Sequence, residues 1–173
     1  SNVPVIAELN VLQQQFGVIS GKMSVTVKGQ EYTLQQAALF LEDEDRSVRE
    51  DVYLKIAERR FQDQAALHEL FDQLLEKRNR IASQANFTDY RAYRFMELGR
   101  FDYDHTTCEQ FHDAVRDHVM PLVNQLYEQK RKKLDVDKLR PWDLEAEPLG
   151  TKPLRPFTNA AELTTKTISC LSA

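Results

Sequence analysis

The stretch Arg78–Tyr103, RNRIASQANFTDYRAYRFMELGRFDY, decides how we interpret the fold. It closes a long helical pattern, turns at Asn86-Phe87, adds a short aromatic-rich helix and leaves through Gly99. Glycine at that position favours the left-handed backbone conformation that ends many helices. The stretch therefore predicts a corner at which three helices meet.

Upstream of this corner, the span Arg46–Ala85 contains neither Gly nor Pro, and its apolar residues recur at steps of mostly three to five. This spacing predicts an amphipathic helix. Its length exceeds that of most globular helices, so we expect a kink or break inside it. We expect Ser47, followed by Glu50, to begin the helix after the acidic run 42–45. The predicted core positions are Val48, Val52, Ile56, Phe61, Ala65, Leu70, Leu74 and Ile81.

The first residues predict a helix followed by a small hairpin. Apolar residues at helical spacing in 3–15 indicate a short amphipathic helix that Gly17 would end. Alternation over 23–27 and a turn at 28–31 predict a β-hairpin. Thr33 with Gln36 has the form of a capping box, which predicts a further helix over Leu34–Leu41.

Downstream of the corner, Thr88 is expected to cap the short helix, and Thr107 to begin another. Pro121 lies inside this next helix and should kink it near His118, because proline removes a backbone donor. The cations of Lys130–Lys133 suit the negative end of the same helix. Its predicted core positions are Phe111, Val115, Val119, Leu122, Val123, Leu126 and Tyr127.

Residues 134–157 hold four of the six prolines and predict an extended connector pinned by Trp142. Thr158 or Asn159 would cap a final helix. The chain is therefore expected to be mainly α, an array of long helices with a small β-hairpin near the N-terminus. Because it starts without Met and ends within a helical pattern, both ends are expected to be internal to a longer protein.

Composition narrows the functional classes. The net charge of −4 provides no overall positive potential that would attract nucleic acid or anionic lipid. Cys108 and Cys170 lie far apart, which argues against a disulfide framework or a thiolate metal site. No apolar run approaches the roughly 20 residues that span a bilayer, and no signal peptide is apparent. We expect a soluble, cytoplasmic protein.

Histidines offer the first candidates for chemistry. His68-Glu69 with Asp72 partly resembles the zinc-binding pattern His-Glu-x-x-His, but the second ligand is Asp and no third ligand is nearby. The simpler interpretation is a solvated helix face. His112 and His118 would point about 120° apart on one helix, so with His105 they favour ordinary surface or cap positions.

Basic and aromatic residues offer the second set of candidates. Lys130–Lys133, with Lys138 and Arg140, lack the glycine loop or aromatic interleaving of a phosphate or nucleic-acid site. The aromatic residues near the corner favour core packing over a stacking platform. They are Tyr90, Tyr93, Phe95, Phe101 and Tyr103. The neighbouring charges are interpreted as ion pairs that fix the corner: Arg91, Arg94 and Arg100 with Asp89, Asp102 and Asp104.

Several short motifs, in order and at matching spacing from about Gly29 to Phe157, resemble the oligoendopeptidase F branch of the thimet-oligopeptidase-like zinc metallopeptidases. They are Asp45-Arg46-Ser-Val-Arg49-Glu50, Lys77-Arg78-Asn-Arg-Ile-Ala82, Asn86-Phe87-Thr-Asp-Tyr90, Arg100-Phe-Asp102-Tyr103, Pro121-Leu122 and Leu139-Arg-Pro-Trp-Asp143. One departure is Asn86, where the family has Gly; Asn tolerates the left-handed conformation better than most residues, so the turn can survive.

The resemblance implies a parent zinc metalloendopeptidase that hydrolyses short peptides and carries its His-Glu-x-x-His motif further downstream. It implies that 1–45 end the N-terminal region, and that 46–173 form the helical start of the peptidase domain within a larger helical fold. No catalytic, cofactor-binding or metal-binding residue is expected here, and zinc belongs to the parent. The expected partners are short peptides and the rest of the peptidase domain, with no nucleic acid or membrane. The alternative is a self-contained helical interaction module without enzymatic activity.

Overall fold

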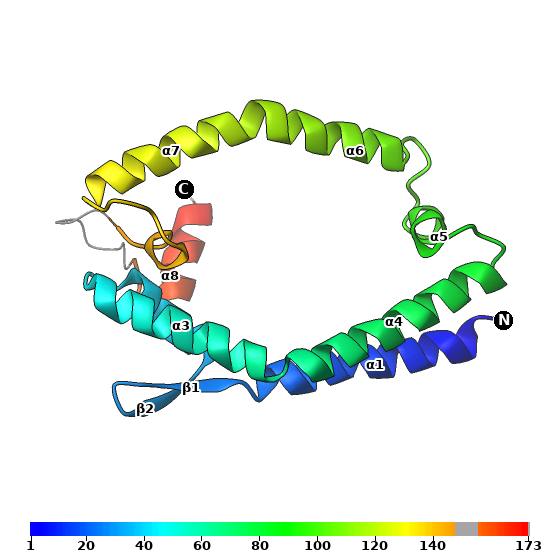
Figure 1. Cartoon of the computed structure of the whole chain (residues 1–173), viewed down its shortest axis with the longest axis horizontal. Helices are drawn as coiled ribbons and strands as arrows, with labels where there is room; N and C mark the ends of the chain where they lie inside the picture. Colours follow the sequence, from blue (N-terminus) through cyan, green and yellow to red (C-terminus); the bar gives the residue numbers. More distant parts are fainter. Residues whose placement is uncertain (148–155, 173) are drawn as a thin grey trace.

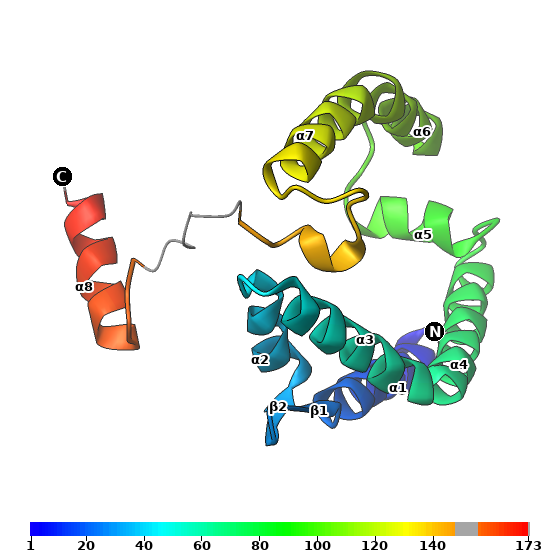
Figure 2. The same ribbon diagram turned by 60° about the vertical axis from the view of Figure 1, so that its left-hand side comes forward.

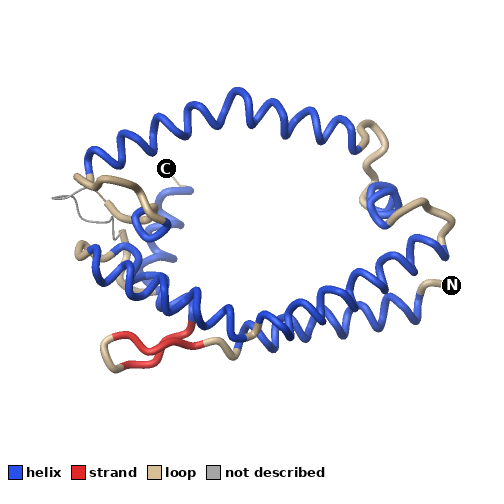
Figure 3. The backbone as a smooth tube through the Cα atoms, viewed as in Figure 1, coloured by secondary structure: helices blue, strands red, loops and turns tan. Residues whose placement is uncertain are grey.

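The computed structural model describes residues 1–147 and 156–172. The mainly α fold with one two-stranded hairpin is confirmed (Figure 3). The elements in chain order are α1 Val3–Gly21, β1 Ser24–Val27, β2 Gln30–Thr33, α2 Leu34–Ala38, the 3-10 helix η1 Leu39–Glu42, α3 Arg46–Gln62, α4 Gln64–Gln84, α5 Tyr90–Glu97, α6 His105–Ala114, the π-helical turn η2 Val115–Val119, α7 Met120–Lys133, the 3-10 helix η3 Pro141–Asp143 and α8 Ala160–Leu171.

The helices form a ring (Figure 1). α3 and α4 make one arm, with α1 lying against α4. The chain turns through α5 at the predicted corner, and α6, η2 and α7 return as the opposite arm. η3 then packs against α3, which brings the end of the returning arm back to the start of the first.

The first helix runs past its predicted end. α1 continues through Gly17 to Gly21, so the expectation that Gly17 ends it is wrong. Glycine inside a helix costs only about 1 kcal/mol relative to alanine. Burial of Val5 and Leu9 with Ile81 of α4 favours the helix as a whole and outweighs that cost.

The hairpin has a tighter turn than the sequence suggested. The strands pair antiparallel, with Val27 opposite Gln30, so only Lys28 and Gly29 form the turn. Both have positive φ, 50° and 82°, as two-residue hairpin turns require. The capping box then begins α2: Thr33 accepts from the Gln36 backbone N–H, and the Gln36 side chain accepts in return from the Thr33 N–H.

Three predicted helix starts are corrected. Asp45, Asp89 and Asp104 cap α3, α5 and α6, in place of Ser47, Thr88 and Thr107. Each Asp carboxylate accepts a backbone N–H of the first helical turn, at 2.8–3.0 Å. A carboxylate caps a helix at least as well as a hydroxyl and also suits the positive end of the helix dipole. The long helix breaks at Asp63, as expected of such a span.

Three helices end in the same backbone motif. Asn86, Gly99 and Asp135 follow α4, α5 and α7 with φ of 61°, 67° and 52°. In each case two backbone N–H groups donate back to carbonyls of the last turn, as in Phe87 N–H to Ala82 O at 3.0 Å. This is the Schellman motif, which needs a left-handed residue. The prediction that Asn86 keeps the left-handed turn is therefore confirmed.

The second arm is irregular where Pro121 predicted it to be. The π turn η2 precedes the proline, and the Met120 N–H donates five residues back, to Val115 O. Because Pro121 has no N–H to give, the wider turn lets the helix continue into α7. Lys130–Lys133 form its last turn, as predicted.

Two apolar clusters hold the first arm. One joins the hairpin and α2 to Val52 and Ile56 of α3, and the other joins α1 to α4 and α5. Phe61 and Ala65 of the first arm are exposed, so their predicted burial is wrong. Five of the seven predicted core residues of the second arm are exposed as well, because no helix of the described residues packs along α6 and α7. The exposed fractions are 66% for Phe111, 46% for Val119, 58% for Leu122, 62% for Leu126 and 44% for Tyr127.

The C-terminal part includes α8, which stands apart from the other helices (Figure 2). Asn159 caps it and accepts from the Glu162 N–H at 2.9 Å, which confirms one of the two predicted caps. Two prolines of the predicted connector, Pro148 and Pro153, lie outside the described residues. Among the described residues, no helix combines the length and apolar character needed to cross a membrane.

Candidate functional site

The junction that closes the ring is centred on the carboxylate of Asp143, which is 0% exposed. Arg46 donates to it through Nε and Nη2 at 3.0 and 2.9 Å, and Arg49 through Nη2 at 3.1 Å. The Arg140 backbone N–H adds a fourth hydrogen bond, at 2.9 Å. A buried carboxylate is stable only when it is paired in this way.

Arg49 is 4% exposed, and its Nε and Nη1 groups donate to backbone carbonyls. They are those of Asp43 at 2.8 Å, Glu44 at 3.1 Å and Trp142 at 3.1 Å. Trp142 also packs against Tyr53, with ring centroids 5.6 Å apart, so it pins the connector as predicted. Burial alone would raise the pKa of Asp143, but hydrogen bonds from Arg46, the Arg140 N–H and Arg49 lower that pKa below the usual value.

The corner contains a cavity of about 440 Å³ between α5 and the start of α6. Arg100 lies 5.3 Å from the Phe95 ring centroid and 6.0 Å from that of Tyr103. It therefore makes cation–π contacts rather than the predicted ion pair. Asp89 and Asp104 serve as helix caps, and Arg91 and Arg94 pair with Glu109 and Glu97 instead. The predicted pairing of Arg91, Arg94 and Arg100 with Asp89 and Asp104 is wrong, because both carboxylates cap helices.

The corner aromatics divide into two groups. Tyr90 and Tyr93 pack against the cluster of α1 and α4, as predicted for core residues. Phe101 is 78% exposed and Tyr103 is 39% exposed, so the core prediction is wrong for these two. Both follow the end of α5, where the chain leaves the packed helices.

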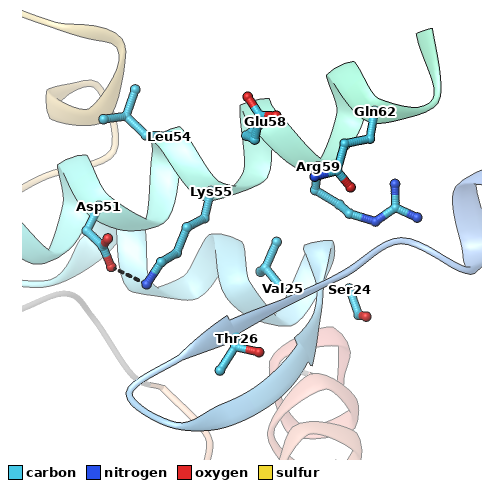
Figure 4. A pocket seen from close by; sticks show the side chains of 9 residues that line it. All are labelled: Ser24, Val25, Thr26, Asp51, Leu54, Lys55, Glu58, Arg59 and Gln62. Atoms are coloured by element: carbon cyan, nitrogen blue, oxygen red, sulfur yellow. Dashed lines mark hydrogen bonds and ion pairs between the residues drawn. The ribbon is translucent and has the colours of Figure 1, made fainter. Parts of the chain in front are cut away.

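A second cavity, of about 570 Å³, lies between the hairpin and α3. Its walls come from β1 and from the flank of α3 that faces solvent (Figure 4). The residues are Ser24, Val25, Thr26, Asp51, Leu54, Lys55, Glu58, Arg59 and Gln62. We call this the β1–α3 groove. Nothing in the local sequence pattern places α3 beside β1, so this groove could not be predicted.

The histidine candidates do not converge. His68, Glu69 and Asp72 are exposed on α4, in agreement with a solvated helix face. His105 and His112 are exposed on α6, and His118 is exposed within η2. In residues 1–147 and 156–172, no three His, Cys, Asp or Glu side chains gather in a way that could hold a metal ion.

The basic cluster closes a helix and holds the connector. Lys130 donates to the Leu144 carbonyl, and Arg131 donates to the Val136 carbonyl at 2.8 Å. These contacts support the helix-end interpretation of the cluster. Cys108 and Cys170 are both free.

The family model for peptidase family M3 matches residues 39–169. The chain belongs to this family. The match begins before α3 and ends within α8, so it includes both arms of the ring, the corner and the Asp143 junction. A search of curated proteins gave no match.

Solved structures agree with the M3 assignment. An oligoendopeptidase F is 26% identical, with a TM-score of 0.81 over 84% of this chain and 26% of its own. PZ peptidase A, solved with an inhibitor, is 26% identical, with a TM-score of 0.79 over 82% of this chain and 25% of its own. An oligoendopeptidase F from Bacillus anthracis str. Ames shares the fold at 21% identity, with a TM-score of 0.88 over 97% of this chain and 31% of its own. The M3 chain thus spans about a quarter to a third of these relatives.

The structure also explains two motifs of the resemblance. Arg46 and Arg49 belong to the motif at 45–50, and Asp143 ends the motif at 139–143. The two meet in the junction, although 94 residues separate Arg49 from Asp143. Two arginines in one motif and an aspartate in the other are a complementary signal, but the sequence alone did not show that they touch.

Proposed function

We propose that this chain is a non-catalytic helical portion of a zinc-dependent oligoendopeptidase that hydrolyses short peptides in the cytoplasm. The observation that carries the proposal is the M3 match over 39–169. The 26% identity to an oligoendopeptidase F and to PZ peptidase A supports it. The whole protein's activity is proposed, because the chain spans only part of those relatives.

The zinc is assigned to another part of the parent protein. The residues described here do not fit a zinc site, since they bring together no set of three candidate ligands. The sequence contains no His-Glu-x-x-His. When bound in such peptidases, zinc polarises a carbonyl and activates water. The present chain alone is therefore proposed to be inactive.

The role proposed for these residues is structural. The Asp143 junction ties the returning arm to α3 and so fixes the ring. The exposed apolar residues of α6 and α7 are proposed to pack against the rest of the peptidase domain, because an apolar face of this size is rarely left to solvent. The division into 1–45, from the N-terminal region, and 46–173, from the peptidase domain, stays part of the proposal.

The test is to express the complete protein that contains this chain and to assay an internally quenched short peptide. We expect hydrolysis that is abolished by a chelator and restored by zinc, with about one zinc per protein. Residues 1–173 alone are the matched control and should show neither activity nor stoichiometric zinc. If no His-Glu-x-x-His follows in the reading frame, the peptidase proposal fails and the interaction-module alternative takes its place.

A further inference from the structure

The outer edge of β1 is unpaired in the part of the chain that the structure describes. β1 pairs only with β2. Ser24 lies opposite Thr33, Val25 opposite Tyr32, Thr26 opposite Glu31 and Val27 opposite Gln30. In antiparallel pairs, hydrogen-bonded and non-hydrogen-bonded residue pairs alternate, and the pair that closes a two-residue turn is hydrogen-bonded. The backbone N–H and C=O groups of Ser24 and Thr26 therefore point away from β2. Within the described residues no other segment bonds to them.

This free edge lies in the β1–α3 groove. The groove is lined by β1 and not by β2, so it follows the outer side of the hairpin. Figure 4 shows Val25 on the side of β1 that faces α3, with Ser24 and Thr26 on the other side. Leu54 of α3, 52% exposed, adds an apolar contact on the opposite wall. The groove thus offers unpaired backbone groups beside a mostly polar wall that includes Leu54.

The charges of the groove leave one carboxylate without a partner. Lys55 pairs with Asp51 at 2.7 Å, and Arg59 pairs with Asp63 at 2.5 Å. Glu58 is exposed between them on the same helix, and no described residue forms an ion pair or hydrogen bond with it. The α3 side of the groove therefore carries an unpaired negative charge.

We propose that the β1–α3 groove binds an extended peptide segment as a third strand on β1, with a basic side chain of the peptide beside Glu58. Backbone pairing at Ser24 and Thr26 would supply the binding, as in other cases of strand addition, and the charge would supply the preference. A third strand would lie about 4.8 Å from β1. The proposal concerns binding only and does not depend on the peptidase proposal.

The test uses the complete protein treated with a chelator, so that loss of hydrolysis and loss of binding are separate results. The probe is a fluorescein-labelled nonapeptide of alternating Thr and Val with a central Lys, and binding is followed by fluorescence anisotropy. A central Glu should weaken binding about two- to fivefold, as expected for an exposed ion pair. N-methylation of the alternate peptide residues whose N–H groups would face β1 should weaken binding about tenfold or more. N-methylation of the peptide residues whose N–H groups face away from β1 should leave binding unchanged.

Two pairs of variants localise the binding. Thr26→Pro removes the outward N–H and should weaken every peptide about fivefold or more, while Thr26→Val keeps that N–H and should bind as the unaltered protein does. Glu58→Gln should abolish the preference for Lys over Glu, and Glu76→Gln, an exposed carboxylate of α4, should keep it. If Thr26→Pro does not fold, binding of the two N-methylated peptide series to the unaltered protein tests the backbone pairing instead.

Three results would overturn the proposal. The first is equal binding of both N-methylated series, which would exclude backbone pairing. The second is an unchanged Lys preference in Glu58→Gln. The third is the absence of saturable peptide binding. If the protein instead self-associates and Thr26→Pro abolishes that self-association, a second copy of the chain occupies the edge and the proposal is overturned as well.

Discussion

Arg49 and Asp143 form an ion pair of 3.1 Å across 94 residues of chain. The arginine lies in the first turn of α3 and the aspartate ends η3, so this contact joins the two ends of the helical ring. Both groups are buried, and both have their hydrogen bonds satisfied. The ring is thus closed by these polar contacts together with the packing of Trp142 on Tyr53, while the two apolar clusters lie elsewhere along the first arm.

Removing the carboxylate should strongly destabilise the protein. Asp143→Ala leaves Arg49 buried without its anion, and such a loss costs about 3–5 kcal/mol. The free energy of unfolding, measured by urea denaturation, should fall by that amount. Asp137→Ala, at an exposed position of the same connector, should change it by less than about 0.5 kcal/mol. Equal effects of the two substitutions would contradict the role of the junction.

Acid should weaken the same junction. The pKa of Asp143 is lowered in the folded protein, so the folded state binds fewer protons than the unfolded state near that pKa. Its contribution is complete above the unfolded pKa of about 3.9 and is lost as pH falls through the lower folded pKa. Urea midpoints measured from pH 7 to pH 3 should fall more steeply below about pH 4 than those of Asp143→Asn. Parallel curves would show that the pKa of Asp143 is not lowered.

Gly17→Ala should stabilise the protein by about 0.5–1 kcal/mol, because glycine is a poor residue for a helix interior. A Cβ at this position meets nothing within 4 Å. Gly99→Ala is the matched contrast, since φ there is +67° and alanine would be strained. Thermal unfolding should move up for the first variant and down for the second; a decrease for both would mean that α1 does not continue through Gly17.

Asn86 should be sensitive to side-chain type because its φ is 61°. Asn86→Gly should match or exceed the stability of the natural residue, whereas Asn86→Ala should lose about 1 kcal/mol. Asn79→Ala, at an exposed position within α4, should instead be neutral or slightly stabilising, because alanine favours helices. Chemical denaturation of the three variants provides the comparison. A loss in Asn86→Gly would contradict the left-handed helix end.

The apolar face of α7 should matter only when its partner surface is present. In the complete protein, Leu122→Gln and Leu126→Gln should each cost about 2–4 kcal/mol, as expected for buried leucines. Gln129→Ala, exposed on the same helix, should cost less than about 0.5 kcal/mol. Equally small effects at all three positions would show that this face stays exposed and that the peptidase domain does not cover it.

Local structure was the part of the fold that could be predicted from sequence. The hairpin, the Thr33 capping box, the left-handed Asn86 and Gly99 and the irregular turn before Pro121 all depend on neighbours within a few residues. The wrong helix starts at Ser47, Thr88 and Thr107 are local as well. They arise because a neighbouring Asp competes for the same N–H groups: it lies two residues before Ser47, one after Thr88 and three before Thr107.

The sequence by itself determined the family resemblance, the mainly α class and the order of the elements. Periodicity, caps and turn residues act over a few residues and are visible in the sequence. Only the tertiary structure decided that Arg46 and Arg49 meet Asp143, that β1 lies along α3, and that Phe111 and Leu126 are exposed. Burial and ion pairing depend on which distant surfaces touch, and a helical pattern shows which face is apolar but not what covers it.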